Sequence, residues 1–293
     1  MTDQMRVLMC APETGIPLST ADIQELTGGL SGALQGVSVE FCSVAPDAAD
    51  LALRLTEIRE DYRGDIVILP TTPFADDMQK RLIPSVLATQ SADAGRTLLA
   101  RDAGVDPAML RAARARVEEA LQAHGAAAAP QESLLMIVGR GSIDTDANGN
   151  LMKMSRMIWE GMGFGWAEVA YVSGAFPSIE QSLERASRLG FKSIVVMPYV
   201  ILGDAAIDGL HERVIGALGS TTETQVVTAR ALAGDDHVVH TLAERVNEAV
   251  AGNAKSVMNC QLCTYREQVL ALEAHGHDHS HEHAHGHDHN HDD

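Results

Sequence analysis

The sequence of 293 residues has few aromatic side chains, few cysteines and little positive charge. Only 4% of its residues are aromatic, and its formal net charge at pH 7 is −18. A chain this acidic has no basic surface to displace counterions from phosphates, so we do not expect it to bind nucleic acid. The first apolar run, Val7–Cys10, is shorter than a secretory h-region or a membrane span. The sequence therefore predicts a cytoplasmic protein that does not enter a membrane.

The four cysteines fall into two groups. Cys10 and Cys42 lie in apolar, strand-like runs and are predicted to be reduced core residues. Cys260 and Cys263 form a Cys-x-x-Cys pair, which in a reducing compartment indicates metal, cluster or redox chemistry. Two thiolates do not complete a tetrahedral metal site or an iron–sulfur cluster, because each takes four ligands. The missing ligands would come from a second subunit in a homodimer, from the histidine tail, or from Cys10 or Cys42.

Apolar residues make up 45% of the chain, a composition typical of soluble α/β proteins. Each half begins with a buried-type strand and continues with an approximate repeat of strand, helix and strand. The ranges are 6–10, 37–44, 46–62 and 65–70 in the first half, and 134–138, 166–172, 177–189 and 192–198 in the second. Strands that alternate with helices predict right-handed crossovers, and hence a parallel sheet flanked by helices in each half.

The length allows two domains, each with its own core. A helix rich in Ala, Arg and Glu is predicted over 107–124, and the Gly/Ala segment after it indicates a linker. The last helix, 235–250, is expected to close the second domain, and the periodicity is lost after it. The predicted parts are a first α/β domain, a second α/β domain and a disordered tail, over residues 1–129, 130–252 and 253–293 respectively.

The tail holds nine of the thirteen histidines, in alternation with Gly, Asp, Glu and Ala. Neutral imidazoles in a flexible chain bind borderline metals such as Co²⁺, Ni²⁺, Cu²⁺ and Zn²⁺. We therefore expect the tail to bind metal, and its purpose is storage, delivery or detoxification. The predicted ligands, besides Cys260 and Cys263, are His275, His277, His279, His281, His283, His285, His287, His289 and His291.

A glycine-rich turn follows the strand 134–138 and precedes a helix predicted over 151–161. Backbone amides at such a turn attract carboxylates, and the side chains of Arg140 and Ser142 can add charge-assisted hydrogen bonds. The alternative is a tight turn whose glycines only satisfy backbone geometry. The polar residues 144–149 are expected to supply turns and a helix cap. The predicted anion-binding residues are Gly139, Arg140, Gly141 and Ser142.

Five motifs, mostly in the second half and the tail, resemble the long form of CbiX, the sirohydrochlorin cobaltochelatase family of the class II chelatases. The motifs are Gly139-Arg-Gly-Ser-Ile-Asp-Thr-Asp-Ala-Asn148, Ile158-Trp-Glu-Gly-Met-Gly-Phe-Gly-Trp166, Pro177-Ser-Ile-Glu180, Ile194-Val-Val-Met-Pro-Tyr199 and Met258-Asn-Cys-Gln-Leu-Cys-Thr-Tyr-Arg266. The resemblance covers the first half only in outline. It implies two chelatase-like α/β domains around one cleft, where cobalt or iron enters sirohydrochlorin. It also implies an iron–sulfur centre at Cys260 and Cys263.

The first half lacks the two active-site histidines that the family carries. One belongs to a Gly-His-Gly-Ser turn after the first strand, where this chain has Met9-Cys-Ala-Pro-Glu-Thr14. The other precedes a segment that ends in Ile-Pro, and Met78 stands where it would fall. Metal insertion needs a ligand for the ion and a base for two pyrrole protons, and imidazole suits both tasks.

The residues that could replace these histidines are predicted by position alone. Glu13, Asp76 and Asp77 are the candidate oxygen ligands or bases, and Met78 is a soft ligand. His211 comes shortly after the strand that ends near Tyr199, so we expect it near the mouth of the cleft. The alternative for the three carboxylates is that they are solvated loop residues.

We therefore predict an enzyme that inserts a divalent metal into sirohydrochlorin or a related acidic tetrapyrrole in cobalamin-type biosynthesis. Cobalt is the first choice, before nickel, iron and zinc. In this hypothesis Arg140 and Ser142 bind the peripheral carboxylates of the macrocycle, and the histidine tail donates the metal. One alternative is a catalytically inactive chelatase-derived protein that carries a tetrapyrrole or a metal. Another is a redox or cluster-sensing protein centred on Cys260 and Cys263.

Overall fold

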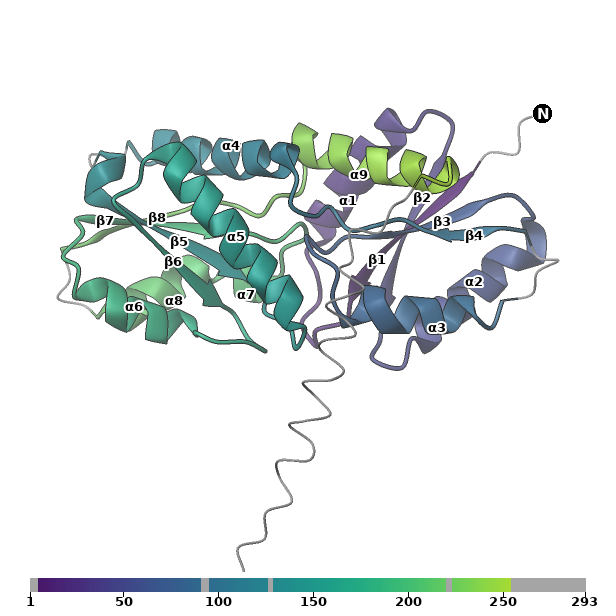
Figure 1. Cartoon of the computed structure of the whole chain (residues 1–293), viewed down its shortest axis with the longest axis horizontal. Coiled ribbons are helices and arrows are strands. Elements are labelled where there is room, and N and C mark those ends of the chain that lie inside the picture. The colour runs from purple at the N-terminus through teal and green to yellow at the C-terminus, as the bar shows by residue number, and fades with distance from the viewer. Residues whose placement is uncertain (1–4, 91–94, 126–128, 220–222, 254–293) are drawn as a thin grey trace, which may run out of the picture. The chain divides into compact units, whose positions relative to one another are not determined.

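The computed structural model describes residues 5–90, 95–125, 129–219 and 223–253. These residues form two four-stranded parallel sheets, each flanked by helices (Figure 1). The predicted α/β class is therefore confirmed, with a parallel sheet in each half. No helix in these ranges has the length and apolarity that a membrane crossing requires.

The first sheet has the strand order β2-β1-β3-β4. Its strands are β1 (Arg6–Pro12), β2 (Ser38–Val44), β3 (Ile66–Pro70) and β4 (Thr97–Leu99). In register, Arg6 of β1 pairs with Ser38 of β2 and with Ile66 of β3. The helices of this half are α1 (Thr20–Ala33), α2 (Ala49–Asp61), the π-helical turn η1 (Met78–Leu82) and α3 (Ile83–Leu87).

The second sheet repeats this order as β6-β5-β7-β8. Its strands are β5 (Ser133–Gly139), β6 (Trp166–Tyr171), β7 (Ser193–Pro198) and β8 (Gln225–Thr228). The helices of this half are the short 3₁₀ turn η3 (Pro130–Glu132), α5 (Thr145–Met162), α6 (Ile179–Ser187), α7 (Ala205–Asp208) and α8 (Leu210–Leu218). The equal strand order confirms the repeat that the sequence pattern predicts.

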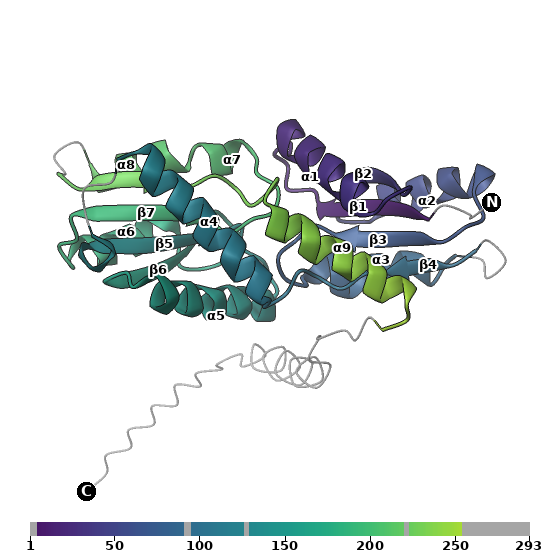
Figure 2. The ribbon, with the colours of Figure 1, turned by 90° about the horizontal axis from the view of Figure 1, so that it is seen from above.

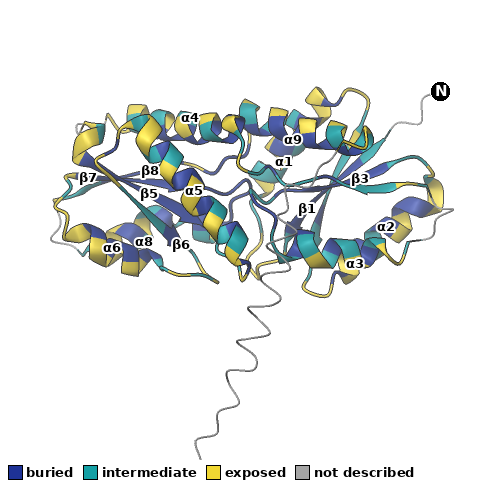
Figure 3. Ribbon diagram, viewed as in Figure 1, coloured by how far each residue is buried: buried dark blue, intermediate teal, exposed yellow. Residues whose placement is uncertain are grey.

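The central strands β3, β5 and β7 are buried along their whole length because helices cover both faces of each sheet (Figure 3). This is why β3, β5 and β7 appear in the sequence as continuous apolar runs instead of alternating ones. Asp144 caps α5 by accepting hydrogen bonds from the amides of Asp146 and Ala147 at 3.0 and 3.3 Å. The expected cap is confirmed, and it starts the helix six residues before the predicted position.

The two halves exchange helices. Helix α4 (Pro107–Ala123) follows the first sheet but packs against α5, β7 and β8 of the second. Helix α9 (Asp236–Val250) follows the second sheet but packs against α1, β3 and β4 of the first, and Figure 2 shows both helices in these places. The expectation that the last helix closes the second domain is therefore wrong. An amphipathic pattern predicts that a helix buries one face, but it does not say against which sheet.

Candidate active site

A cavity of about 520 Å³, here called the central cavity, lies where the carboxyl ends of strands from both sheets meet. Its walls follow β1, β2 and β3 in the first half and β5, β6 and β7 in the second. Ligands of open α/β sheets bind at this position, because the loops after parallel strands come together there. The central cavity is therefore the candidate active site.

All four first-half residues that the sequence singles out line this cavity. They are Glu13, Asp76, Asp77 and Met78. Glu13 follows β1, and its amide donates to the carbonyl of Val44 at 2.9 Å, which ties the loop to the end of β2. Met78 begins η1 and is 2% exposed, so it forms part of the packed wall. The structure thus brings together three carboxylates and a thioether from two segments, the loop after β1 and the segment that leads into η1.

Asp76 has the electrostatic character of a base that works near neutral pH. Burial raises the pKa of its carboxyl from 3.8 to about 6. Hydrogen bonds from the amides of Gln79 and Met78 oppose this rise in pKa, and the charge of Asp144 adds to it. A carboxylate with this pKa is ionised at pH 7 and still accepts a proton more readily than an ordinary aspartate.

Asp77 lies beside Asp76 but has a different environment. Both oxygens of its carboxylate accept hydrogen bonds from Arg81, at 2.9 and 2.7 Å. This pair lies on the solvent side of η1 and balances the charge of Asp77. Of the two adjacent carboxylates, Asp76 is therefore the stronger candidate for proton transfer.

Lys80 was not predicted, yet it joins the two halves beside the central cavity. Its ammonium lies 3.0 Å from a carboxylate oxygen of Asp144 and 3.1 Å from one of Asp146. Burial alone would lower the pKa of Lys80, but its hydrogen bonds to these two carboxylates raise it overall, so the side chain stays charged. The lysine thereby offsets the negative charge of Asp144 close to Asp76. Sequence offers no signal for a pair whose partners are 66 residues apart.

On the opposite wall Arg140 lines the central cavity and is already engaged by the protein. Its guanidinium forms an ion pair with Asp204 and donates to the carbonyl of Leu202 at 2.8 Å. Asp204 is 1% exposed, and it also caps α7 by accepting from the amides of Ala206 and Ile207 at 3.0 Å. Most of the charge of Arg140 is therefore balanced internally. Its remaining N–H groups are those left for a ligand.

The glycine-rich turn is held by bonds within itself. Gly141 has a φ of +91°, and a Cβ there would lie 1.7 Å from the carbonyl oxygen of Ser173, so only glycine fits. The hydroxyl of Ser142 accepts from the amide of Asp144 at 3.0 Å, and the amide of Ser142 donates to Asn148 at 3.2 Å. At Gly141 the turn therefore requires glycine for its backbone geometry, as the alternative interpretation of this motif predicts. Anion binding by the four residues from Gly139 to Ser142, which all line the cavity, stays a prediction.

Apolar and aromatic groups form much of the remaining wall. The rings of Phe74 and Tyr199 stack with centroids 5.8 Å apart and planes 9° from parallel. The hydroxyl of Tyr171 donates to the carbonyl of Asn148 at 3.1 Å, which fixes a third ring at the wall. Ile143 also lines the cavity and is 72% exposed. Such a surface suits a flat, largely apolar ring whose polar groups lie at its edge.

His211 does not line the central cavity, contrary to expectation. It lies on α8 with its Nδ1 at 3.2 Å from the hydroxyl of Thr228, and it borders a separate depression of about 330 Å³ together with His124. The chain after Tyr199 follows the cavity wall as far as Leu202 and then enters α7, which precedes α8. Closeness in sequence to the end of β7 was therefore a poor guide to the position of this histidine.

The proposed metal ligands of the tail, including Cys260 and Cys263, lie outside the described residues and stay predictions, as does an iron–sulfur cluster. Within the described ranges no group of three or more His, Cys, Asp or Glu side chains is placed to hold a metal ion.

The two sheets, with a cavity at their carboxyl ends, define a chelatase-like α/β protein. The CbiX family model matches residues 134–249, and the resemblance to that family is confirmed. The chain is 27% identical over 232 residues to the sirohydrochlorin cobaltochelatase of Priestia megaterium, which covers 78% of this chain and 74% of that protein. It is 25% identical over 116 residues to the sirohydrochlorin ferrochelatase of the same organism, which covers 40% of this chain and 43% of that protein.

Solved structures show the same fold. SirB from Bacillus subtilis with Fe³⁺ matches with a TM-score of 0.64 at 16% identity, over 86% of this chain and 98% of that one. CbiX, described as the terminal enzyme of siroheme biosynthesis in denitrifying bacteria, matches with a TM-score of 0.56 at 15% identity, over 84% of this chain and 99% of that one. At these identities the two structures support the architecture of the chain and nothing finer.

Proposed function

We propose that the protein is a sirohydrochlorin chelatase that inserts a divalent metal ion into the macrocycle, with cobalt as its first substrate. Support comes from the relative named as a cobaltochelatase, whose match extends over more of the chain than that of the ferrochelatase. The observation that carries the proposal is Asp76, a cavity carboxylate whose burial raises its pKa to about 6. We place the reaction in a cobalamin-type pathway and in the cytoplasm.

Insertion replaces two pyrrole protons by one metal ion, so the protein must accept protons while the metal–nitrogen bonds form. Asp76 takes the first proton: a pyrrole N–H bond breaks and an O–H bond forms on its carboxylate. A base with a pKa of about 6 accepts this proton and releases it again at neutral pH. Glu13 follows β1 on the same side of the cavity and is the candidate for the second proton.

The metal ion is a substrate in this reaction and must leave the protein. Glu13, Asp76 and Met78 are the donors that the first-half wall offers it. Carboxylates and a thioether hold Co²⁺ less tightly than the two histidines of the family would. A weaker set of ligands makes it easier for the macrocycle to take the ion, and we infer that the histidine tail keeps the local supply high.

The macrocycle lies in this proposal with its faces against the apolar wall and its carboxylates toward Arg140 and Ser142. Arg140 binds these carboxylates with the N–H groups that do not already bond to Asp204 and Leu202. Its pair with the buried Asp204 fixes the position of the guanidinium before the ligand arrives. A prepositioned side chain loses less conformational entropy on binding than a mobile one.

The test is an anaerobic absorbance time course with sirohydrochlorin, Co²⁺ and a substoichiometric amount of the full-length protein, next to a protein-free control. We expect insertion to continue beyond one equivalent of protein and to proceed faster than in the control. A spectral change that saturates at one equivalent, without acceleration, would instead indicate a chelatase-derived carrier.

A further inference from the structure

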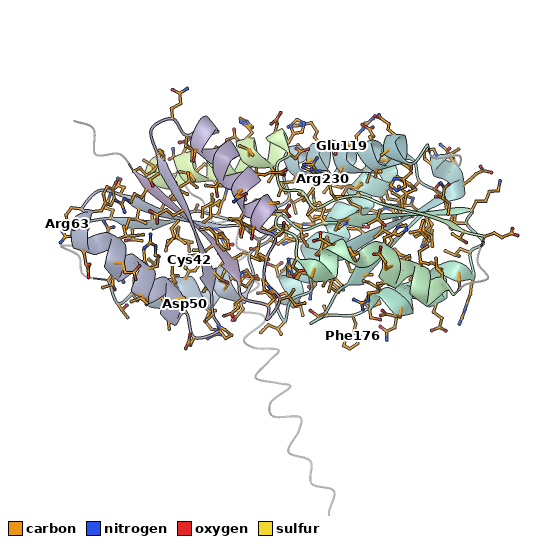
Figure 4. The ribbon with its side chains drawn as sticks, turned by 180° about the vertical axis from the view of Figure 1, so that it is seen from behind. Cys42, Asp50, Arg63, Glu119, Phe176 and Arg230 are labelled. Carbon is orange, nitrogen blue, oxygen red and sulfur yellow. The ribbon has the colours of Figure 1, made fainter. Side chains whose placement is uncertain are left out.

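Two free cysteines lie side by side in the first sheet, next to the central cavity. Cys10 of β1 and Cys42 of β2 are direct partners in the register of the two parallel strands. Both belong to the core cluster between the sheet and α2, so their side chains lie on the same face of the sheet. The thiol of Cys10 donates to the carbonyl of Leu8 at 3.6 Å, and the thiol of Cys42 donates to the carbonyl of Ser43 at 3.2 Å. Figure 4 shows Cys42 on its strand near Asp50 of α2.

The strand spacing is compatible with a bond between these sulfurs. Neighbouring strands lie about 4.7–4.9 Å apart, and Cα atoms joined by a disulfide are usually about 4.4–6.8 Å apart. The Cβ atoms must approach slightly more closely than strand pairing alone brings them. Strand β2 is at the edge of its sheet and pairs within it with β1 alone, so it can make this adjustment without disturbing a second partner.

The two thiols differ in a way that assigns their roles. Cys10 is fully buried, whereas Cys42 is 8% exposed and lies on the edge strand, so Cys42 is the thiol that a small reagent can reach. The neighbouring thiol of Cys10 lowers the pKa of Cys42, and Arg54 adds to this effect, while burial and the charge of Asp50 oppose it. The neighbouring thiol of Cys42 and burial raise the pKa of Cys10. Cys42 is therefore the nucleophile and Cys10 the second, resolving thiol.

We propose that Cys10 and Cys42 form an oxidative modification site, a dithiol that a hydroperoxide converts to a disulfide. In the first step the sulfur of Cys42 attacks hydrogen peroxide: an S–O bond forms, the O–O bond breaks, and water leaves with the thiol proton. In the second step the sulfur of Cys10 attacks that of Cys42: an S–S bond forms, the S–O bond breaks, and a second water leaves. The two thiols lose two electrons and two protons, and the peroxide becomes two waters.

This site adjoins the central cavity through the backbone of Cys10. The carbonyl of Cys10 accepts hydrogen bonds from the amide and the hydroxyl of Thr71, at 2.8 and 3.0 Å. Thr71 lines the cavity, and so do Ala11 and Pro12, which directly follow Cys10. A disulfide between Cys42 and Cys10 that draws β2 toward β1 would therefore displace residues at the base of the cavity wall. The proposal does not rest on the chelatase function, because it concerns the two thiols alone.

The test uses the full-length protein, reduced, freed of reductant and treated with about one equivalent of hydrogen peroxide. Both thiols lie on one tryptic peptide, residues 7–54, because no Lys or Arg occurs between Arg6 and Arg54. The disulfide therefore appears as the loss of two hydrogen atoms from that peptide. A glutamate-specific protease then cleaves between the cysteines, after Glu13, Glu25 and Glu40, and the fragments 7–13 and 41–54 should stay joined until dithiothreitol is added.

The matched control is Cys10→Ala, which keeps Cys42 but removes the resolving thiol. In this variant the same treatment should leave a sulfenic acid on Cys42 that dimedone traps, whereas the native chain should give little of that adduct. The proposal is overturned if both thiols of the native protein remain free to alkylation, if Cys42 is oxidised without joining Cys10, or if Cys42 joins Cys260 or Cys263. The peptide map of the native protein decides among these results even if the variant does not fold.

Discussion

Asp76→Asn should make the protein more stable above about pH 6 while removing its proposed base. The carboxyl has a pKa of about 6 in the folded protein and an ordinary value of 3.8, so the folded state binds more protons between these pH values. Stability due to this group is therefore highest at low pH and falls as the pH rises from 3.8 to about 6. At about 1.36 kcal/mol for each pKa unit, the loss is about 3 kcal/mol once the group is ionised.

Asparagine is neutral at every pH and can still accept the hydrogen bonds that the amides of Met78 and Gln79 donate to Asp76. Urea unfolding should give equal free energies of unfolding for the variant and the native protein near pH 4. By about pH 8 the variant should be more stable by up to about 3 kcal/mol. The control is Asp77→Asn, which loses only an exposed ion pair with Arg81 and should change the free energy of unfolding little. A difference between Asp76→Asn and the native protein that stays constant with pH, or a less stable variant at pH 8, would refute the reasoning.

Three further results are expected. Lys80→Met removes the cation that offsets the charge of Asp144, so the pKa of Asp76 should rise. The rise should appear as a shift of the acid limb of the insertion rate to higher pH, and an unshifted limb would show that Lys80 does not act on Asp76. Gly141→Ala should lower the free energy of unfolding by at least about 1–3 kcal/mol, because Gly141 has a positive φ and a close carbonyl neighbour. Gly149→Ala, in open space on α5, should raise it by roughly 0.5–1 kcal/mol. Equal effects of the two variants in urea unfolding would contradict this account. Truncation after Leu272 should leave the circular dichroism spectrum unchanged and reduce the metal bound per chain, and unchanged metal content would mean that the histidine tail is not the main store.

The central strands of both sheets could be predicted closely because helices cover both of their faces, whereas the short outer strands β4 and β8 were not predicted. The predicted run 134–138 is one residue shorter than β5 at each end, and the predicted run 192–198 begins one residue before β7 and ends with it. Helix α1 gave no comparable signal, because the pair Gly28-Gly29 weakens its helix propensity. Packing against α9 stabilises this helix instead. A Cβ at Gly29 would come within 2.7 Å of Val239 on α9, so glycine permits the close approach of the two helices.

Four residues of the first-half wall could be named from the sequence because they stand where the family's two histidines would fall, and all four line the cavity: Glu13, Asp76, Asp77 and Met78. They come together because the loops after parallel strands converge at one edge of the sheet. The raised pKa of Asp76 could not be predicted, because it depends on how far the folded chain buries the carboxyl and on the charge of Asp144 in the other half. Lys80 was missed because its partners are distant in sequence, and His211 was misplaced because α7 carries the chain away from the cavity.

The most direct test of the central claim is the steady-state rate of cobalt insertion into sirohydrochlorin as a function of pH, in the native protein and in Asp76→Asn. We expect multiple turnovers in the native protein, with a rate that rises with pH through about 6. The variant should lose roughly 100-fold or more of the rate, as when a general base is removed. A variant as fast as the native protein at every pH would contradict the assignment of Asp76 as the base.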